Sequence, residues 1–239
     1  MTEAERTLLE EGLSDLLSSQ QIHLVERYCD ELALWNPKLR LVDASGSDLI
    51  VRHVFDCLAA LPALRESLQV QRANADPPVL ADLGSGAGLP GFLFAIAVPE
   101  IRVWLIERGG RRCGFLRNCR AVLGLSNTEV HETASESLSG ESCHLVTARA
   151  YAPLTPELLR LVYRLLKPEG EALLFKGQRA RLNEELAAAS TAAQWDRVDV
   201  RVDAVTVPRL DSERHLVRIR KTGPSNSDQQ KGIAGQSAT

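Results

Sequence analysis

Four glycines fall within eight residues of this sequence, between two apolar runs. Gly84, Gly86, Gly88 and Gly91 lie in the stretch VLADLGSGAGLPGFLFAIAV, which begins at residue 79. Glycine adopts positive φ angles and lets a ligand approach the bare backbone closely. In open parallel sheets, ligands bind beyond the carboxyl end of a strand, where the chain turns into the next helix. The glycine turn is therefore a candidate cofactor site.

Two acids accompany the glycine turn and leave the identity of its ligand open. Gly86 to Gly91 fit the dinucleotide pattern G-x-G-x-x-G, and Glu107 comes 23 residues after Gly84, where an acid would meet ribose hydroxyls. Asp82, two residues before the first glycine, instead favours an adenosylmethionine-type cofactor, because a carboxylate there can order the turn or reach a cationic ligand. The residues alone allow either cofactor, or a glycine bend without a ligand.

Other kinds of catalytic group are not indicated. The run ARAYAPL, which contains Arg149, stands where methyltransferases that act on exocyclic amines place D-P-P-Y or N-P-P-Y. Cys143 precedes the fourth expected strand without a partner motif. The five cysteines form no C-x-x-C pair, so we expect neither a disulfide framework nor a metal site.

The elements that must position these residues are short β-type runs that alternate with amphipathic stretches. This alternation predicts a doubly wound, mostly parallel sheet with helices on both faces. Two final β-rich runs follow each other without a helix and predict an antiparallel edge. The expected strands are 79–84, 102–107, 128–132, 144–148, 171–176, 197–207 and 214–221, and the expected helices after residue 79 are 89–98, 111–124, 155–166 and 180–193.

Composition divides the chain into three segments. Residues 1–70 carry apolar residues at helical spacing and predict a helical extension, broken at Pro37 and resumed at a helix capped by Ser47. Residues 71–221 form the expected α/β domain. Residues 222–239 hold few large apolar side chains, so we expect them to be disordered.

The sequence predicts a cytoplasmic protein. No apolar run reaches the roughly 18 to 20 residues that span a membrane, and the acidic first residues differ from the basic start of a secretory signal. We expect a monomer.

The net charge of −3 hides an uneven distribution. Residues 1–31 carry eight acids and only two basic side chains. Five arginines without an intervening acid fall in residues 108–120. This cluster predicts either a solvated helix face or a surface for nucleic-acid phosphates.

Six segments of the chain carry a family resemblance when they are taken in order. They are HVFDCL after Arg52, DLGSGAGLPG, GRRCGFLRN, TARAYAPL, LLFKGQ and SERHLVRI. Together they resemble the glucose-inhibited division protein B (GidB/RsmG) family of bacterial 16S ribosomal RNA guanine-N7 methyltransferases, over about residues 34–220. The resemblance implies a class I methyltransferase (Rossmann-like) fold, S-adenosyl-L-methionine as cofactor, and 16S ribosomal RNA or the small ribosomal subunit as partner.

The resemblance also implies roles for individual residues. Gly84 and Leu89 match cofactor contacts of the glycine turn, Ala134 and Ser135 match adenine contacts, and Arg149 matches the arginine that ends the fourth strand. The expected cofactor-binding residues are Asp82, Gly84, Gly86, Gly88, Leu89, Glu107, Ala134, Ser135 and Arg149. The expected RNA-binding residues are Arg52, His53, Arg111, Arg112, Arg117, Arg214 and His215.

The implied chemistry needs few groups. Guanine N7 is an acceptor without a proton to lose, so no general base is required. We expect Arg149 to orient the base or the cofactor carboxylate and Lys176 to contact phosphate or base. Alternatively, Arg149 could form only a salt bridge at the end of its strand. Arg52 and Asp56 could likewise simply form an ion pair with each other, since they are four residues apart on a helix.

Two other functions remain open from the sequence: a nicotinamide-binding oxidoreductase and a non-catalytic ribosomal RNA-binding module.

Overall fold

A computed structural model describes residues 1–71 and 76–222 of the chain. Within these residues, a seven-stranded sheet has the strand order β3-β2-β1-β4-β5-β7-β6. The strands are β1 (Val79–Leu83), β2 (Arg102–Glu107), β3 (Thr128–Glu132), β4 (Cys143–Arg149), β5 (Leu166–Lys176), β6 (Val198–Ala204) and β7 (His215–Lys221).

The sheet is parallel from β3 to β5, and the pairings of β7 with β5 and β6 are antiparallel. The predicted mostly parallel sheet with an antiparallel edge is confirmed. All of β1 is buried, as expected for a strand covered on both faces.

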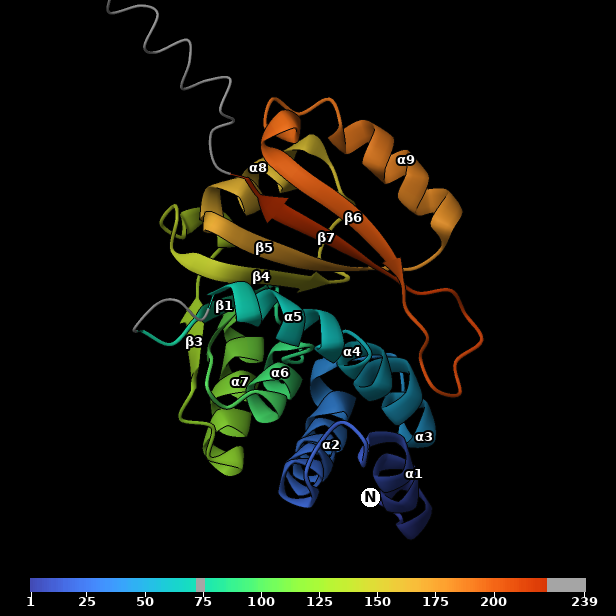
Figure 1. Ribbon diagram of the computed structural model, residues 1–239. Helices are drawn as coiled ribbons and strands as arrows, with labels where there is room; N and C mark the ends of the chain where they lie inside the picture. Colours follow the sequence, from blue (N-terminus) through green and yellow to red (C-terminus); the bar gives the residue numbers. More distant parts are fainter. Residues whose placement is uncertain (72–75, 223–239) are drawn as a thin grey trace, which may run out of the picture.

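Helices cover both faces of the sheet (Figure 1). On one side α8 (Pro156–Leu165) and α9 (Arg179–Ala189) pack over side chains such as Ala81 and Val146. On the other side α6 (Gly91–Ala97) and α7 (Gly110–Leu123) pack over the alternate side chains, such as Leu80. Short 3-10 turns lie at η2 (Ser135–Ser137) and η3 (Trp195–Arg197).

The first 71 residues are helical, as predicted. They form α1 (Glu3–Leu13), α2 (Ser19–Leu39), α3 (Gly46–Leu49), the π-helical η1 (Ile50–Phe55), α4 (Asp56–Leu58) and α5 (Leu61–Gln71). Thr2 and Ser18 cap α1 and α2 with capping boxes. The apolar residues of these helices belong to the same core as α6 and α7 (Figure 1).

Two local predictions in this segment are wrong. Helix α2 continues past Pro37 to Leu39, because proline removes a single helix hydrogen bond near the end, while Trp35 and Leu39 still pack on the core. The N-cap position of α3 is Ser45 rather than Ser47.

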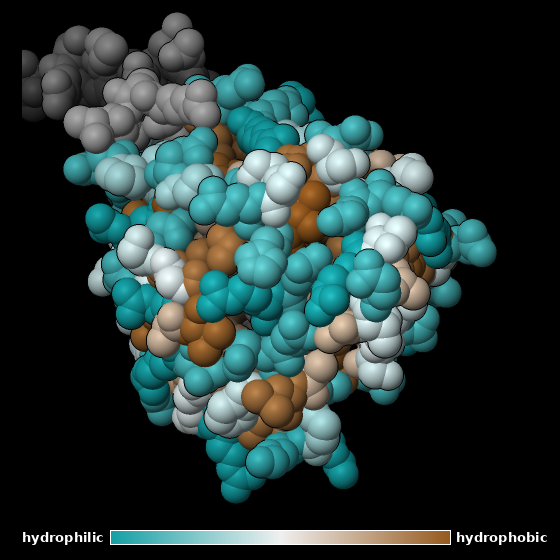
Figure 2. All heavy atoms as spheres, turned by 90° about the horizontal axis from the view of Figure 1, so that it is seen from below, coloured by the Kyte–Doolittle hydropathy of each residue, from teal (hydrophilic) through white to brown (hydrophobic). Residues whose placement is uncertain are grey.

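The predicted tail at 222–239 lies outside the described residues, except for Thr222. Among the described helices, none is long and apolar enough to cross a membrane. The face formed by the N-terminal helices is largely hydrophilic, with separate apolar patches (Figure 2).

Candidate functional site

The glycine turn joins the carboxyl end of β1 to α6. Gly84, Gly86 and Gly88 all have positive φ, at 65°, 54° and 84°. A side chain at Gly88 would collide with the ring of Phe92. These glycines are therefore required both by their backbone angles and, at Gly88, by the packing of α6.

Asp82 lies beneath the turn rather than in the cavity beside it. Its Oδ2 accepts a hydrogen bond from Gly91 N at 3.2 Å, and its carbonyl oxygen accepts one from the Ser85 hydroxyl. Its Oδ1 is buried and has no partner among the described residues. Burial raises the pKa of Asp82 to about 7. Asp82 thus orders the turn from within the core.

Glu107 ties the end of β2 to the glycine turn. Its Oε2 accepts from Gly86 N at 3.1 Å and its Oε1 from Gly109 N at 2.8 Å. The Arg112 guanidinium lies 3.9 Å from Oε2. Each carboxylate oxygen accepts more than one hydrogen bond, so Glu107, which lines the adjoining cavity, can still accept from a ligand.

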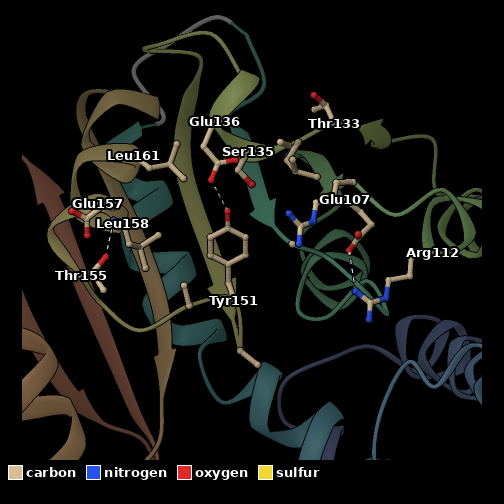
Figure 3. A pocket seen from close by; sticks show the side chains of 16 residues that line it. Glu107, Arg112, Thr133, Ser135, Glu136, Tyr151, Thr155, Glu157, Leu158 and Leu161 are labelled. Atoms are coloured by element: carbon tan, nitrogen blue, oxygen red, sulfur yellow. Dashed lines mark hydrogen bonds and ion pairs between the residues drawn. The ribbon is translucent and has the colours of Figure 1, made fainter.

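A cavity of about 520 Å³ opens beside this turn. The predicted residues Gly84, Glu107, Ala134 and Ser135 line it together. Figure 3 shows Glu107 and Ser135 on one side of the cavity, across from Leu158. The structure thus brings together four predicted cofactor residues that come from three different strand ends.

Tyr151 stands in this cavity and was not predicted as a site residue. It points toward Glu136, and its hydroxyl lies 3.4 Å from the Glu136 carboxylate (Figure 3). Its ring packs so closely over Gly84 that a side chain there would collide with it. In the sequence, the signal available for Tyr151 was an aromatic residue two positions after Arg149, which ends β4.

Arg149 is held by the N-terminal helices. Its Nε donates to Asp56 Oδ2 at 2.9 Å, and its Nη2 donates to the Arg52 carbonyl oxygen, also at 2.9 Å. Arg214 Nε donates to the other oxygen of Asp56 at 2.8 Å. Asp56 therefore clamps the ends of β4 and β7 together and does not pair with Arg52.

His53 completes this cluster. Its Nδ1 lies 3.0 Å from Arg149 Nη2, so it accepts from the guanidinium. Its Nε2 is buried and has no partner among the described residues. Burial, followed by the positive charges of Arg149 and Arg52, lowers the pKa of His53 to about 4. The imidazole is therefore neutral at neutral pH.

Lys176 ends β5 and forms an ion pair with Glu185 of α9. The distance from Nζ to Oε2 is 2.7 Å, and Nζ also donates to the Ala152 carbonyl oxygen at 3.1 Å. Glu185 Oε2 accepts from Leu154 N at 2.7 Å as well. Burial would raise the pKa of Glu185, but the hydrogen bonds from Lys176 and Leu154 lower it below its usual value. Glu185 was not predicted, because nothing in its local sequence distinguishes it from Glu184.

A second cavity, of about 420 Å³, lies at the ends of β4 and β5. It shares Ala150, Tyr151 and Ala152 with the first cavity, and Lys176 and Glu185 line its far part. The two cavities are therefore neighbours across Tyr151.

The predicted RNA-binding residues fall into separate groups. Arg111, Arg112 and Arg117 are exposed on α7, and Arg117 pairs with Glu132 at 2.8 Å. Arg52, His53 and Arg214 belong to the cluster around Asp56. His215 is buried, and its Nδ1 lies 2.6 Å from the Gly177 carbonyl oxygen.

Within the described part of the chain, no group of three or more His, Cys, Asp or Glu side chains could hold a metal ion.

Solved structures of other proteins share this fold. A predicted O-methyltransferase from Agrobacterium tumefaciens matches with a TM-score of 0.54 at 22% identity, covering 71% of this chain and 81% of that chain. A tRNA (m1A58) methyltransferase from Aquifex aeolicus matches with a TM-score of 0.51 at 12% identity, covering 69% and 70%. The predicted class I methyltransferase fold is confirmed.

Sequence comparison gives the family. The family model described as rRNA small subunit methyltransferase G matches residues 21–217. The ribosomal RNA small subunit methyltransferase G of Cupriavidus necator is 36% identical and covers 93% of this chain and 97% of its own length. The protein of the same name from Halorhodospira halophila is 37% identical, covering 76% and 82%. On these similarities, the chain belongs to the rRNA small subunit methyltransferase G (GidB) family.

Proposed function

We propose that this protein transfers the methyl group of S-adenosyl-L-methionine to N7 of a guanine in 16S ribosomal RNA. The observation that carries the proposal is the pair of adjoining cavities at the carboxyl ends of the central strands. The first lies against the glycine turn, and the second begins where the first ends. Such an arrangement suits a cofactor and an acceptor base that must meet. Family membership supports the same activity.

The residues of the first cavity fit this cofactor. The positive φ angle of Gly84 leaves bare backbone at the end of β1, the Glu107 carboxylate can accept from ribose hydroxyls, and Ala134 and Ser135 border the space that an adenine would need. Leu89, Gly86 and Gly88 shape the turn, and Asp82 holds it from below.

The chemistry asks the protein for alignment. When bound, the cofactor supplies a methyl group on a sulfonium. The N7 lone pair forms the new bond to the methyl carbon, while the carbon–sulfur bond breaks and its electron pair stays on sulfur. Because N7 carries no proton, the side chains need not remove one. They must bring the two reactants into line, and such positioning contributes several kcal/mol to catalysis.

Arg149 serves this alignment through the end of β4. Because Asp56 and the Arg52 carbonyl oxygen hold its Nε and Nη2, we assign it the task of fixing the strand that leads into Ala150 and Tyr151. Those two residues border both cavities. Lys176 belongs to the acceptor side.

The exposed arginines of α7 are proposed to bind RNA phosphates. Within residues 1–71 and 76–222, the side chains of Arg108, Arg111 and Arg120 have no ion pair or hydrogen bond. Arg111 and Arg120 lie on α7 and Arg108 lies in the loop just before it, and free guanidinium groups can bind phosphate without first breaking an internal bond.

Calorimetry and a transfer assay test the proposal against its alternatives. The purified protein is expected to bind adenosylhomocysteine and not NADH, and to transfer methyl groups to under-methylated small subunits. Binding of NADH alone would point to an oxidoreductase. Subunit binding without turnover would point to a non-catalytic RNA-binding module.

A further inference from the structure

The second cavity has the place and the lining expected of a base-binding site. It adjoins the cofactor cavity through Ala150, Tyr151 and Ala152. A base that receives a methyl group must lie next to the donor and must leave its stack to enter a protein cavity. This inference rests on the proposed function and asks which residues recognise the base.

Lys176 and Glu185 are the charged pair at the far end of this cavity. Their side chains are only 11% and 12% exposed, so their polar atoms are largely removed from water. The pair is fixed from both sides, since Lys176 donates to the Ala152 carbonyl oxygen and Glu185 accepts from Leu154 N.

Both side chains keep hydrogen-bonding capacity for a ligand. An ammonium group has three donors, and Lys176 uses two of them, for Glu185 and Ala152. The Oε1 atom of Glu185 has one ion-pair contact, at 3.4 Å, with Arg181. Arg181 is 72% exposed and free to turn toward solvent.

The remaining donor and acceptor match one base. The Watson–Crick edge of guanine presents an acceptor, O6, beside two donors, N1–H and the N2 amino group. Adenine presents the opposite order, with its N6 amino group as donor beside N1 as acceptor. We propose that Lys176 donates to O6 and that Glu185 Oε1 accepts from N1–H and N2 of the target guanine. This would leave N7, on the other edge, free to face the methyl group.

Such a pair would set specificity by rejecting other bases. An adenine in the same position would place its amino group against the ammonium and its N1 lone pair against the carboxylate. The ammonium and the carboxylate would then both lose water without gaining a hydrogen-bond partner. Leaving buried polar groups unpaired in this way costs far more binding free energy than the loss of an apolar contact.

Inosine provides the test, because it lacks only the N2 amino group of guanosine. The wild-type protein first locates the methylated position on under-methylated small subunits. Subunits are then reconstituted with 16S ribosomal RNA that carries guanosine or inosine at that position. The kcat/KM of methyl transfer is measured on both for the wild type, Glu185→Gln and the control Glu184→Gln. The control makes the same charge change at an exposed neighbour on α9.

For the wild type and Glu184→Gln, we expect kcat/KM on guanosine subunits to exceed that on inosine subunits by about tenfold or more, the discrimination that one good base contact provides. Glu185→Gln should be slower on guanosine and should lose most of the preference, with adenosylhomocysteine affinity unchanged within about twofold. The new amide oxygen can still accept from Leu154 N. Glu185→Asp, which withdraws the carboxylate by one methylene, should show an intermediate preference and serves as the test if Glu185→Gln does not fold.

A wild-type preference for guanosine that persists in the Glu185 variants would overturn the assignment, and so would a wild type that does not distinguish the two bases. Failure of the wild type to methylate any guanine would instead overturn the proposed function.

Discussion

Asp82 shows at the scale of one residue how the core supports the glycine turn. The carboxyl group is fully buried, and one of its oxygens holds Gly91 while the other has no partner among the described residues. Because the pKa of Asp82 is raised to about 7, its carboxyl group stays protonated in the folded protein up to about that pH. From the sequence, the Asp82 carboxylate could order the turn or reach a cationic ligand, and its hydrogen bond from Gly91 N supports the first of these roles.

The pH dependence of stability tests this role. In the unfolded chain the Asp82 carboxyl loses its proton near its usual pKa of about 4. Between about pH 4 and pH 7 the folded state therefore binds more protons than the unfolded state, and this group's contribution to the free energy of unfolding falls as the pH rises. Asp82→Asn should remove a fall on the order of 2–4 kcal/mol, measured by urea unfolding at pH 4.5 and pH 7.5.

Asp199→Asn is the matched control, because Asp199 is exposed on β6. It should follow the pH profile of the wild type. A profile for Asp82→Asn as steep as that of the wild type would show that the carboxyl is not protonated in the folded protein.

The clamp around Asp56 acts at the scale of elements, since it joins η1 and α4 to the ends of β4 and β7. Asp56 is 4% exposed and accepts hydrogen bonds from Arg149 and Arg214 on its two oxygens. A π-helical turn precedes it, a feature often found at functional sites. The N-terminal helices thereby fix the strand that leads into both cavities.

Asp56→Ala should destabilise the protein strongly, because it leaves the largely buried cation Arg149 without its carboxylate. Breaking a buried pair in this way costs about 3–5 kcal/mol. Glu11→Ala removes the exposed ion pair with Arg209 and should cost at most about 1 kcal/mol. Urea unfolding of both variants gives the comparison, and equal losses of stability would refute the clamp.

At this scale the sequence predicted the sheet well and the clamp poorly. Regular apolar periodicity marked β1, β2 and β3 to within one residue. Strand β5 begins at Leu166, five residues earlier than predicted. The prediction missed this first half because Pro168 and Gly170 are residues typical of a turn. Hydrogen bonds such as that of Asp56 with Arg149 join residues 93 positions apart, and no local pattern specifies them.

The whole molecule combines a proposed cofactor cavity, a proposed acceptor cavity and an arginine-bearing helix on one α/β core. Gly84, Glu107, Ala134 and Ser135, which the sequence predicted to bind the cofactor, line one cavity. Of the residues that line the proposed acceptor cavity, the sequence singled out Lys176. Tyr151 and Glu185 join it only when α9 and the end of β4 are folded together.

RNA binding by α7 and by Arg108, just before this helix, should depend on salt. Removing one arginine that binds a phosphate reduces the slope of log affinity against log salt concentration by roughly one. The double variant Arg108→Ala, Arg111→Ala should therefore bind small subunits more weakly at low salt and with a slope reduced by about two. Arg201→Ala, on β6, is the control and should leave the slope unchanged. A double variant with the wild-type slope would place the RNA on another surface.

Methyl transfer itself tests the central claim most directly. The full-length protein is incubated with labelled S-adenosyl-L-methionine and under-methylated small ribosomal subunits, and the RNA is digested to nucleosides. The account predicts label in 7-methylguanosine. Label in any other nucleoside, or no transfer by a protein that binds adenosylhomocysteine, would contradict it.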